Sequence, residues 1–174
     1  GSQEPTRSAA DALASAKEAS GRLRVSMPAD LAGGVLAQLL VDFVARHPAV
    51  SLELDLSPPS LVIPADPGQL RQIFWNLARN ALAAMPEGGT LSVRARVQGE
   101  RFVFTIRDEG HGMSEEEMDR LFTPFAHSFP GGTGLGLAIV YRVVEEHGGS
   151  IRVESAVGGG TAILPEMKHL TVTR

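Results

Sequence analysis

Three amide side chains recur at four-residue spacing in the middle of the chain, namely Gln72, Asn76 and Asn80. On a helix this spacing places them in one line along one side. Asparagine is a poor helix former, so two of them inside one helix call for a reason. The line is either a solvated outer face or a row of amide oxygens facing a hydrated Mg²⁺ ion, which accepts neutral oxygen ligands.

A carboxylate and two glycines, Asp108, Gly110 and Gly112, come just after a predicted strand. Glycine lets the backbone turn sharply or approach a ligand closely. A carboxylate in such a pocket can accept a hydrogen bond from the exocyclic amine of adenine, and a base without that donor would leave the carboxylate unpaired. On its own, the same pattern also fits a surface turn.

Glycines crowd residues 131–137, which lead directly into a predicted helix. The free backbone N–H groups and the positive end of the helix dipole favour phosphate there, although a flexible loop is the alternative. The segment is not a Walker A loop, because no Lys–Ser/Thr pair closes it. Residues 115–130 predict a short helix and a mobile lid with Phe122 and Phe125, which could equally be core anchors.

The elements that must position these motifs mix strands and helices without strict alternation, which predicts an α+β fold, a two-layer α/β sandwich. Asp66 as N-cap, Pro67 in the first turn and Gln69 in a capping box predict the start of the central helix. Apolar periodicity predicts helices over 31–46, 66–85 and 135–146, and strands over 23–25, 52–56, 90–97, 102–106, 151–154 and 161–164.

Composition bounds the class of protein. A chain of 174 residues with net charge −4 and no Lys/Arg-rich run argues against a nucleic-acid surface. The absence of cysteine excludes disulfides and thiolate metal sites. The longest apolar stretch, 31–45, is shorter than the roughly 20 residues that span a bilayer, so no membrane contact is expected. Residues 1–21 are expected to be a remnant of tag removal and a linker or frayed helix, and 22–174 one domain.

Taken in order, these motifs resemble those of bacterial sensor histidine kinases over roughly residues 65–165. Residues 72–81 resemble the N box and 108–112 the first glycine box. Residues 121–125 look like the F box, 132–137 like the second glycine box, and 146–161 like the C-terminal strand pair. Trp75-Asn76 and residues 83–86 further resemble the nitrogen-regulation branch. Residues 21–56 also look like the opening of a LysR-type effector-binding domain, but a kinase domain places a similar helix and strand there.

The resemblance implies the Bergerat ATP-binding fold of the Hsp90, gyrase and MutL ATPases, a mixed sheet with helices packed on one face. It also implies ATP and Mg²⁺ as cofactors. In that family Asn80 would ligate Mg²⁺, Asn76 would polarise the attacking histidine, and Asp108 would bind the adenine amine. The remaining implied nucleotide contacts are Gly110, Gly112, Phe122, Thr133, Gly134, Leu135, Gly136 and Leu137.

The nucleophile implied by the resemblance is a histidine on a separate dimerisation hairpin. None of the five histidines, which are expected on loops or the surface, has the required sequence setting: His47, His111, His127, His147 and His169. The chain is therefore expected to bind ATP without phosphorylating itself. A response regulator is the expected downstream partner, and the expected location is cytoplasmic, in a parent protein that can be membrane-anchored.

Two departures from the family pattern affect the site. Residues 125–129 read Phe-Ala-His-Ser-Phe and lack a lysine that would face the phosphates, so Arg79, Arg120 or His127 would have to substitute. The last strand is expected to be shortened at Pro165. A degenerate, non-catalytic nucleotide-binding or interaction module is therefore an alternative. An ATPase or anti-sigma serine kinase on the same fold is disfavoured, because those proteins typically carry glutamate where this chain has Asn76.

Overall fold

The computed structural model describes residues 23–26, 35–57, 67–126 and 129–168. The predictions for residues 1–21, for the Asp66 cap and for His127 and His169 lie outside this part of the chain. The described elements are β1 (Leu23–Ser26), α2 (Val35–Arg46), β2 (Val50–Ser57), α3 (Pro67–Ala84), β3 (Gly89–Gln98), β4 (Arg101–Asp108), α4 (Glu115–Asp119), α5 (Gly136–Glu146), β5 (Ser150–Ser155) and β6 (Thr161–Lys168).

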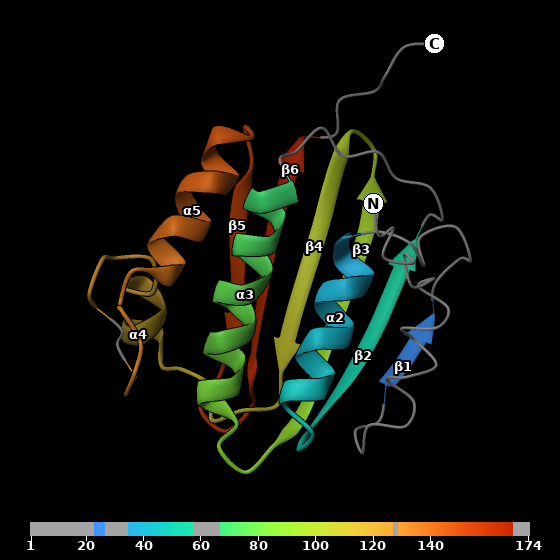
Figure 1. Ribbon diagram of the computed structural model, residues 1–174. Coiled ribbons are helices and arrows are strands. Elements are labelled where there is room, and N and C mark those ends of the chain that lie inside the picture. The colour runs from blue at the N-terminus through green and yellow to red at the C-terminus, as the bar shows by residue number, and fades with distance from the viewer. Residues whose placement is uncertain (1–22, 27–34, 58–66, 127–128, 169–174) are drawn as a thin grey trace, which may run out of the picture.

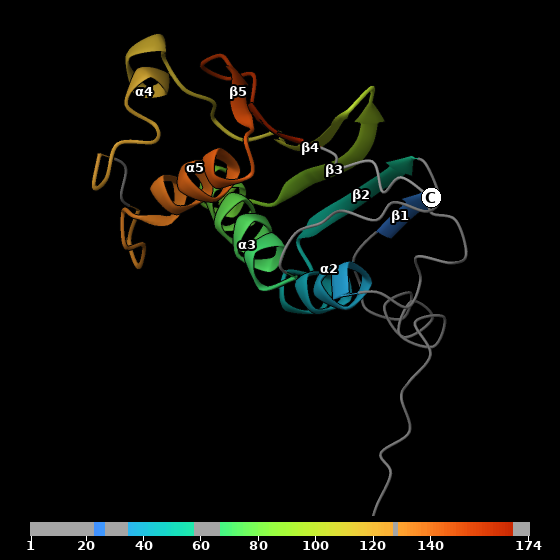
Figure 2. The ribbon, with the colours of Figure 1, turned by 90° about the horizontal axis from the view of Figure 1, so that it is seen from above.

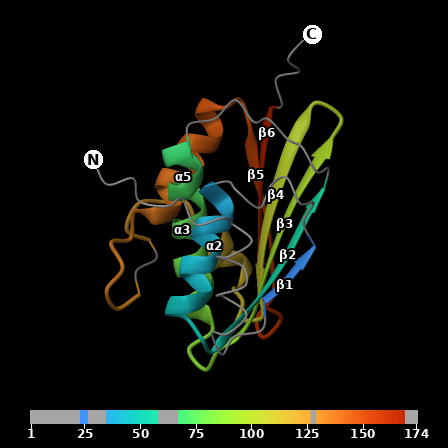
Figure 3. The same ribbon diagram turned by 45° about the vertical axis from the view of Figure 1, so that its right-hand side comes forward.

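The strands form one six-stranded mixed sheet in the order β1-β2-β3-β4-β6-β5. The pairs β1–β2 and β2–β3 are parallel, whereas the pairs β3–β4, β4–β6 and β5–β6 are antiparallel. Figures 1 and 3 show α2, α3 and α5 side by side over one face of this sheet. The view from above in Figure 2 shows the same two layers. The predicted α+β sandwich with helices on one face is confirmed.

The core lies between the helices and the sheet. The apolar stripe of α3 supplies Ile73, Phe74 and Leu77, each at most 2% exposed. Phe43 of α2 is fully buried, and its ring meets the edge of Phe74 with centroids 5.8 Å apart. Burial of aromatic and aliphatic side chains is the main favourable term in folding. This packing fixes α3 against the sheet, and with it the line of amides that α3 carries.

The prediction of a shortened last strand is wrong, because β6 runs for eight residues through Pro165. In the ladder between β4 and β6, Val103 pairs with Glu166 and Ile106 pairs with Ile163. The register is the same on both sides, but the two positions between these pairs are not paired. Proline has no N–H to donate, so a ladder that loses a bond at one position is expected. On the other side, Pro165 still pairs with Ile151 of β5.

No helix among the described residues is long and apolar enough to cross a membrane.

Candidate functional site

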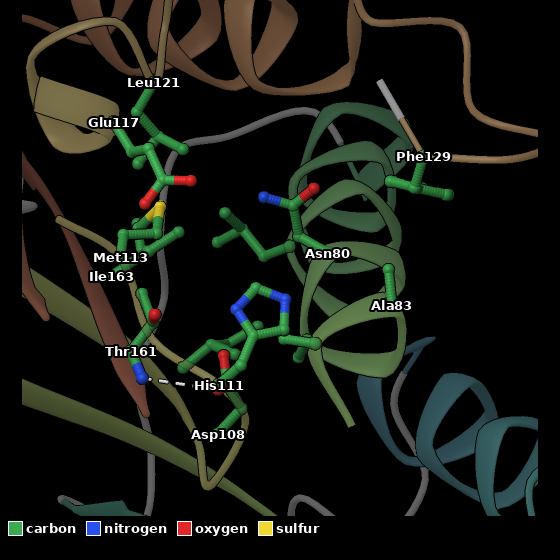
Figure 4. Close-up of a pocket in the computed structure, with 14 residues that line it drawn as sticks. Asn80, Ala83, Asp108, His111, Met113, Glu117, Leu121, Phe129, Thr161 and Ile163 are labelled. Carbon is green, nitrogen blue, oxygen red and sulfur yellow. Dashed lines mark hydrogen bonds between the residues drawn. The ribbon is translucent and has the colours of Figure 1, made fainter. Parts of the chain in front are cut away.

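A cavity of about 210 Å³ opens between α3 and the sheet, at the end of β4 and the start of β6. Figure 4 shows its polar side chains converging from α3, from the loop after β4, from α4 and from β6. Its walls are mostly apolar, as expected for a small-molecule site with a few placed polar groups. The polar side chains that line it are Asn80, Asp108, His111, Glu117 and Thr161.

Asp108 is the last residue of β4 and is only 6% exposed. Its Oδ1 accepts hydrogen bonds from the backbone N–H of Gly110 at 2.9 Å and of Thr161 at 3.3 Å. Both donors use the same oxygen, which leaves Oδ2 for a donor in the cavity. Burial raises the pKa of the Asp108 carboxyl, while the two hydrogen bonds, the charge of Arg107 and that of His111 when its ring is protonated act to lower it. The cavity thus presents one oriented acceptor.

The loop after Asp108 lies too close to its neighbours for side chains at two positions. A Cβ on Gly110 would overlap Ala84 at the end of α3. Gly112 has φ +69°, and a Cβ there would overlap the carbonyl oxygen of Ala156. Glycine is the residue that permits both the positive φ and the close approach. The loop is therefore clamped between α3 and the β5–β6 turn, which holds Asp108 at the cavity floor.

A second cavity, of about 50 Å³, adjoins the first and lies beside the glycine-rich segment. Asn80 lines both cavities, and so do Leu121 and Phe129. Four of the five predicted contacts of the glycine-rich segment line this cavity, as does Arg79. The second cavity is lined by Asn76, Arg79, Asn80, Thr133, Gly134, Gly136 and Leu137, among others.

Asn76 carries the one buried side-chain polar atom of the described chain that lacks a hydrogen-bond partner, its Nδ2. A Cβ built on Gly136 would lie 3.1 Å from Asn76 Oδ1, so the start of α5 packs directly on this amide. An unpartnered buried donor is costly and calls for an explanation such as an unoccupied ligand position. A phosphate oxygen would supply the missing acceptor.

The start of α5 offers backbone donors to the same place. Leu135 at the N-cap position makes no side-chain capping bond to this eleven-residue helix. The loop is tightened because Thr133 Oγ1 accepts from the Leu135 N–H at 3.3 Å, and Gly134 O accepts from the Phe125 N–H at 2.8 Å. The first turn of a helix has N–H groups without intrahelical partners, and these favour an anion.

The residues fit a nucleotide with a hydrated metal ion. The described residues hold no cluster of three His, Cys, Asp or Glu side chains that could bind a metal alone. The amide of Asn80 borders both cavities and can give one neutral oxygen. Mg²⁺ commonly keeps several waters and takes its other ligands from substrate phosphates, so one protein oxygen is enough.

Four predicted contacts line neither cavity: Gly110, Gly112, Phe122 and Leu135. Phe122 is half-buried and its ring packs on Tyr141 at 5.7 Å between centroids. Leu135 is the N-cap residue and does not line the second cavity. Of the proposed substitutes for the missing lysine, Arg120 pairs with Glu116 at 2.8 Å on the surface of α4, whereas Arg79 faces the second cavity.

Sequence reasoning missed most of the lining of the first cavity, including the polar residues His111, Glu117 and Thr161 and the aromatic Phe129. Thr161 follows the glycine pair 159–160, a signal assigned only to the strand pair. His111 stands between the two loop glycines and is exposed, as expected for a loop residue, and it also lines the cavity. Phe129 was noted only as part of the altered lid, and it lines both cavities.

Comparison with known proteins decides the family. Residues 65–169, more than half of the chain, match the family described as histidine kinase-, DNA gyrase B- and HSP90-like ATPase. The chain belongs to this family. It is 41% identical to sporulation kinase E of Bacillus subtilis over 134 residues. The matched region covers 76% of this chain and 18% of that protein. It is also 41% identical over 122 residues to the sensor histidine kinase ZraS of Klebsiella oxytoca, covering 70% of this chain and 26% of ZraS.

Solved structures of family members agree with the fold. The mycobacterial sensor histidine kinase MprB matches with TM-score 0.68 at 32% identity, covering 77% of this chain and 91% of that one. The catalytic domain of the histidine kinase ThkA matches with TM-score 0.70 at 25% identity, with 77% and 90% covered. The chain is thus similar to whole catalytic domains, although it spans only about a fifth to a quarter of the curated relatives it matches.

Proposed function

We propose that this chain is the catalytic domain of a two-component sensor histidine kinase. It binds Mg²⁺ and ATP and transfers the γ-phosphoryl group to a histidine on a separate dimerisation hairpin. A response regulator acts downstream, and the domain works in the cytoplasm. The observation that carries the proposal is the continuous pair of cavities, with the Asp108 carboxylate in one and the unpartnered Asn76 amide in the other.

In this proposal the parts of ATP bind to separate groups. Asp108 Oδ2 accepts from the adenine amine, while Ile106 and Ile163 supply apolar walls beside the base. The triphosphate extends past Asn80 into the second cavity, toward Asn76 and the first turn of α5. Asn80 would hold Mg²⁺, which would supply neutralisation of the phosphate charge. Phosphoryl transfer needs chiefly positioning and charge stabilisation, which these amides and backbone N–H groups provide.

The second cavity favours transfer to a partner over hydrolysis. None of its described lining residues is a carboxylate or a histidine that could activate water as a general base. In the first cavity, the Glu117 carboxylate is partly engaged, since its Oε2 accepts from the Ser114 N–H at 2.8 Å. This lining supports an attacking group that is supplied by another protein segment.

Phosphate transfer to an added hairpin tests the proposal. The chain is incubated with Mg²⁺ and γ-labelled ATP, with and without a separately produced sensor-kinase hairpin and its His→Gln form. Acid-labile label is expected only on the hairpin that keeps its histidine. Asn76→Ala is expected to reduce the rate by about a hundredfold, as for loss of one transition-state donor.

Two results would contradict the kinase proposal in different ways. Steady release of phosphate without any hairpin would identify an ATPase. Binding of ADP without transfer to any hairpin tried would identify a degenerate nucleotide-binding module.

A further inference from the structure

His111 is an ionisable residue of the first cavity to which neither the family motif nor the proposed function gives a role. It stands between the two glycines of the loop after β4 and lines the cavity with Asp108 and Asn80. Figure 4 shows its ring inside the cavity, between Asp108 at the floor and Asn80 on α3. Although His111 is an exposed loop residue, its ring lines the cavity.

The loop holds His111 firmly in this position. Its backbone N–H donates to Ala84 O at 3.1 Å, and its carbonyl accepts from the Gly158 N–H at 2.7 Å. The ring is fixed as well, because Nδ1 lies 2.7 Å from the carbonyl oxygen of Gly112. The side chain is therefore oriented before any ligand arrives, which reduces the entropy lost on binding.

The Nδ1 contact also fixes the tautomer. A carbonyl oxygen only accepts, so Nδ1 must carry the hydrogen. In the neutral ring, Nε2 is then a hydrogen-bond acceptor. None of the described residues forms a hydrogen bond with Nε2. The cavity thus holds a second oriented acceptor beside Asp108 Oδ2.

We infer that His111 is a second nucleoside-recognition residue, whose Nε2 accepts a hydrogen bond from a donor on the nucleoside. The nucleoside offers two kinds of donor, the exocyclic amine of the base and the ribose hydroxyls. Because the base lies at Asp108 and the phosphates beyond Asn80, the nucleoside must occupy the space that the ring faces. The inference rests on the proposed nucleotide binding and adds selectivity at that site.

Titration of matched nucleotides tests the inference. ADP, IDP, 2′-deoxy-ADP and 3′-deoxy-ADP are titrated calorimetrically, with Mg²⁺, into the whole chain and into its His111→Phe and His111→Gln variants. Phenylalanine keeps a ring and removes the acceptor, whereas glutamine keeps an acceptor. His111→Phe is expected to weaken ADP by about three- to tenfold, the usual effect of one net hydrogen bond.

The pattern across nucleotides identifies the donor. If His111→Phe binds ADP more weakly than the wild type does but binds IDP equally well, the donor to His111 is the exocyclic amine that IDP lacks. If instead one deoxy-nucleotide binds equally well to both proteins, the donor is the ribose hydroxyl that this nucleotide lacks. His111→Gln is expected to recover part of the lost affinity. Equal weakening of all four nucleotides in His111→Phe, or no weakening, would overturn the inference and leave the proposed function intact. Wild-type protein that binds no ADP would overturn both.

Discussion

At the scale of single residues, Asp108 combines a structural cost with a binding function. Its carboxyl is buried at the end of β4, and burial is the largest cause of its raised pKa. A buried anion is tolerated only where hydrogen bonds compensate its lost hydration. Gly110 and Thr161 supply two of these bonds to Oδ1. The other oxygen is left for a ligand, so the empty site carries an uncompensated part of the cost.

The stability of the empty protein should reveal that cost. A raised pKa in the folded state means that this group stabilises the fold at low pH and that the contribution is lost as pH rises through the folded pKa. At neutral pH the buried carboxylate is charged and destabilises the fold, so Asp108→Asn should raise the thermal midpoint of the ligand-free protein. The midpoint should rise by about 2–4 °C for each kcal/mol of unfolding free energy that the substitution adds. Differential scanning calorimetry at pH 7 measures it. A lower midpoint would mean that the carboxylate stabilises the empty fold.

The same carboxyl should make nucleotide affinity depend on pH. Only the ionised Asp108 accepts a hydrogen bond at both oxygens, so affinity should fall as pH drops through its pKa, by up to about tenfold per pH unit. Because that pKa is raised, the fall should begin above the range of an ordinary aspartate. ADP titrations in the wild type and in Asp119→Asn, an exposed site on α4, should share this profile. A flat profile down to the ordinary aspartate range would exclude Asp108 as the acceptor.

At the scale of elements, the site depends on the clamp between the loop after β4 and the β5–β6 turn. Gly158 N–H donates to His111 O at 2.7 Å, and Met113 N–H donates to Ser155 Oγ at 2.9 Å. Ser155 Oγ in turn donates to Gly160 O at 2.9 Å. These bonds join segments that are far apart in sequence, and they place Thr161 beside Asp108. The first cavity keeps its shape only while the hydrogen bonds of this clamp are formed.

Substitution of Gly112 tests the clamp. Gly112→Ala should cost more than the roughly 1–2 kcal/mol of a left-handed alanine, because its Cβ would overlap Ala156. Gly99→Ala is the matched control, since Gly99 has φ +61° in the β3–β4 turn with nothing within 4 Å of a Cβ. Urea unfolding should show the larger loss for Gly112, together with weaker ADP binding. Equal losses for both variants would show that the contact with the β5–β6 turn is unimportant.

The sequence predicted the central elements well because their signals are local. The apolar stripe of α3, the amides beside it and the glycines before α5 can each be recognised within a few residues. The length of β6 could not be recognised in this way. Pro165 suggested an early end, but whether a proline interrupts a strand depends on which neighbour its missing N–H would face. That is a property of the assembled sheet.

The site was predictable only where its residues belong to local motifs, and its contacts between distant segments were not. Asp108 and Thr161 lie 53 positions apart, and only the β4–β6 pairing brings the Thr161 N–H to the carboxylate. Phe122 and Phe129 look equivalent as lid aromatics in sequence, yet Phe122 packs on Tyr141 while Phe129 lines both cavities. Which face of a loop meets a cavity is decided by packing, and the spacing of residues carries no signal for it.

At the scale of the whole molecule, the two layers bring every proposed ATP contact to one side of the sheet. The helix α3 presents Asn76 and Asn80, the sheet ends present Asp108 and Thr161, and α5 begins beside Asn76. The acceptor histidine has no counterpart in this layout among the described residues. Under the proposed function, this layout supplies the nucleotide contacts, and phosphoryl transfer requires an assembly with a second segment.

Nucleotide titration of one variant pair tests the central claim most directly. ADP with Mg²⁺ is titrated into the wild type, Asp108→Asn and Asp119→Asn, with folding checked by calorimetry. The wild type and the Asp119 variant should bind alike, and Asp108→Asn should lose binding, because an amide cannot accept from two backbone donors and from the base as a carboxylate does. Undiminished binding by a folded Asp108→Asn variant would contradict the assignment of this cavity as the ATP site.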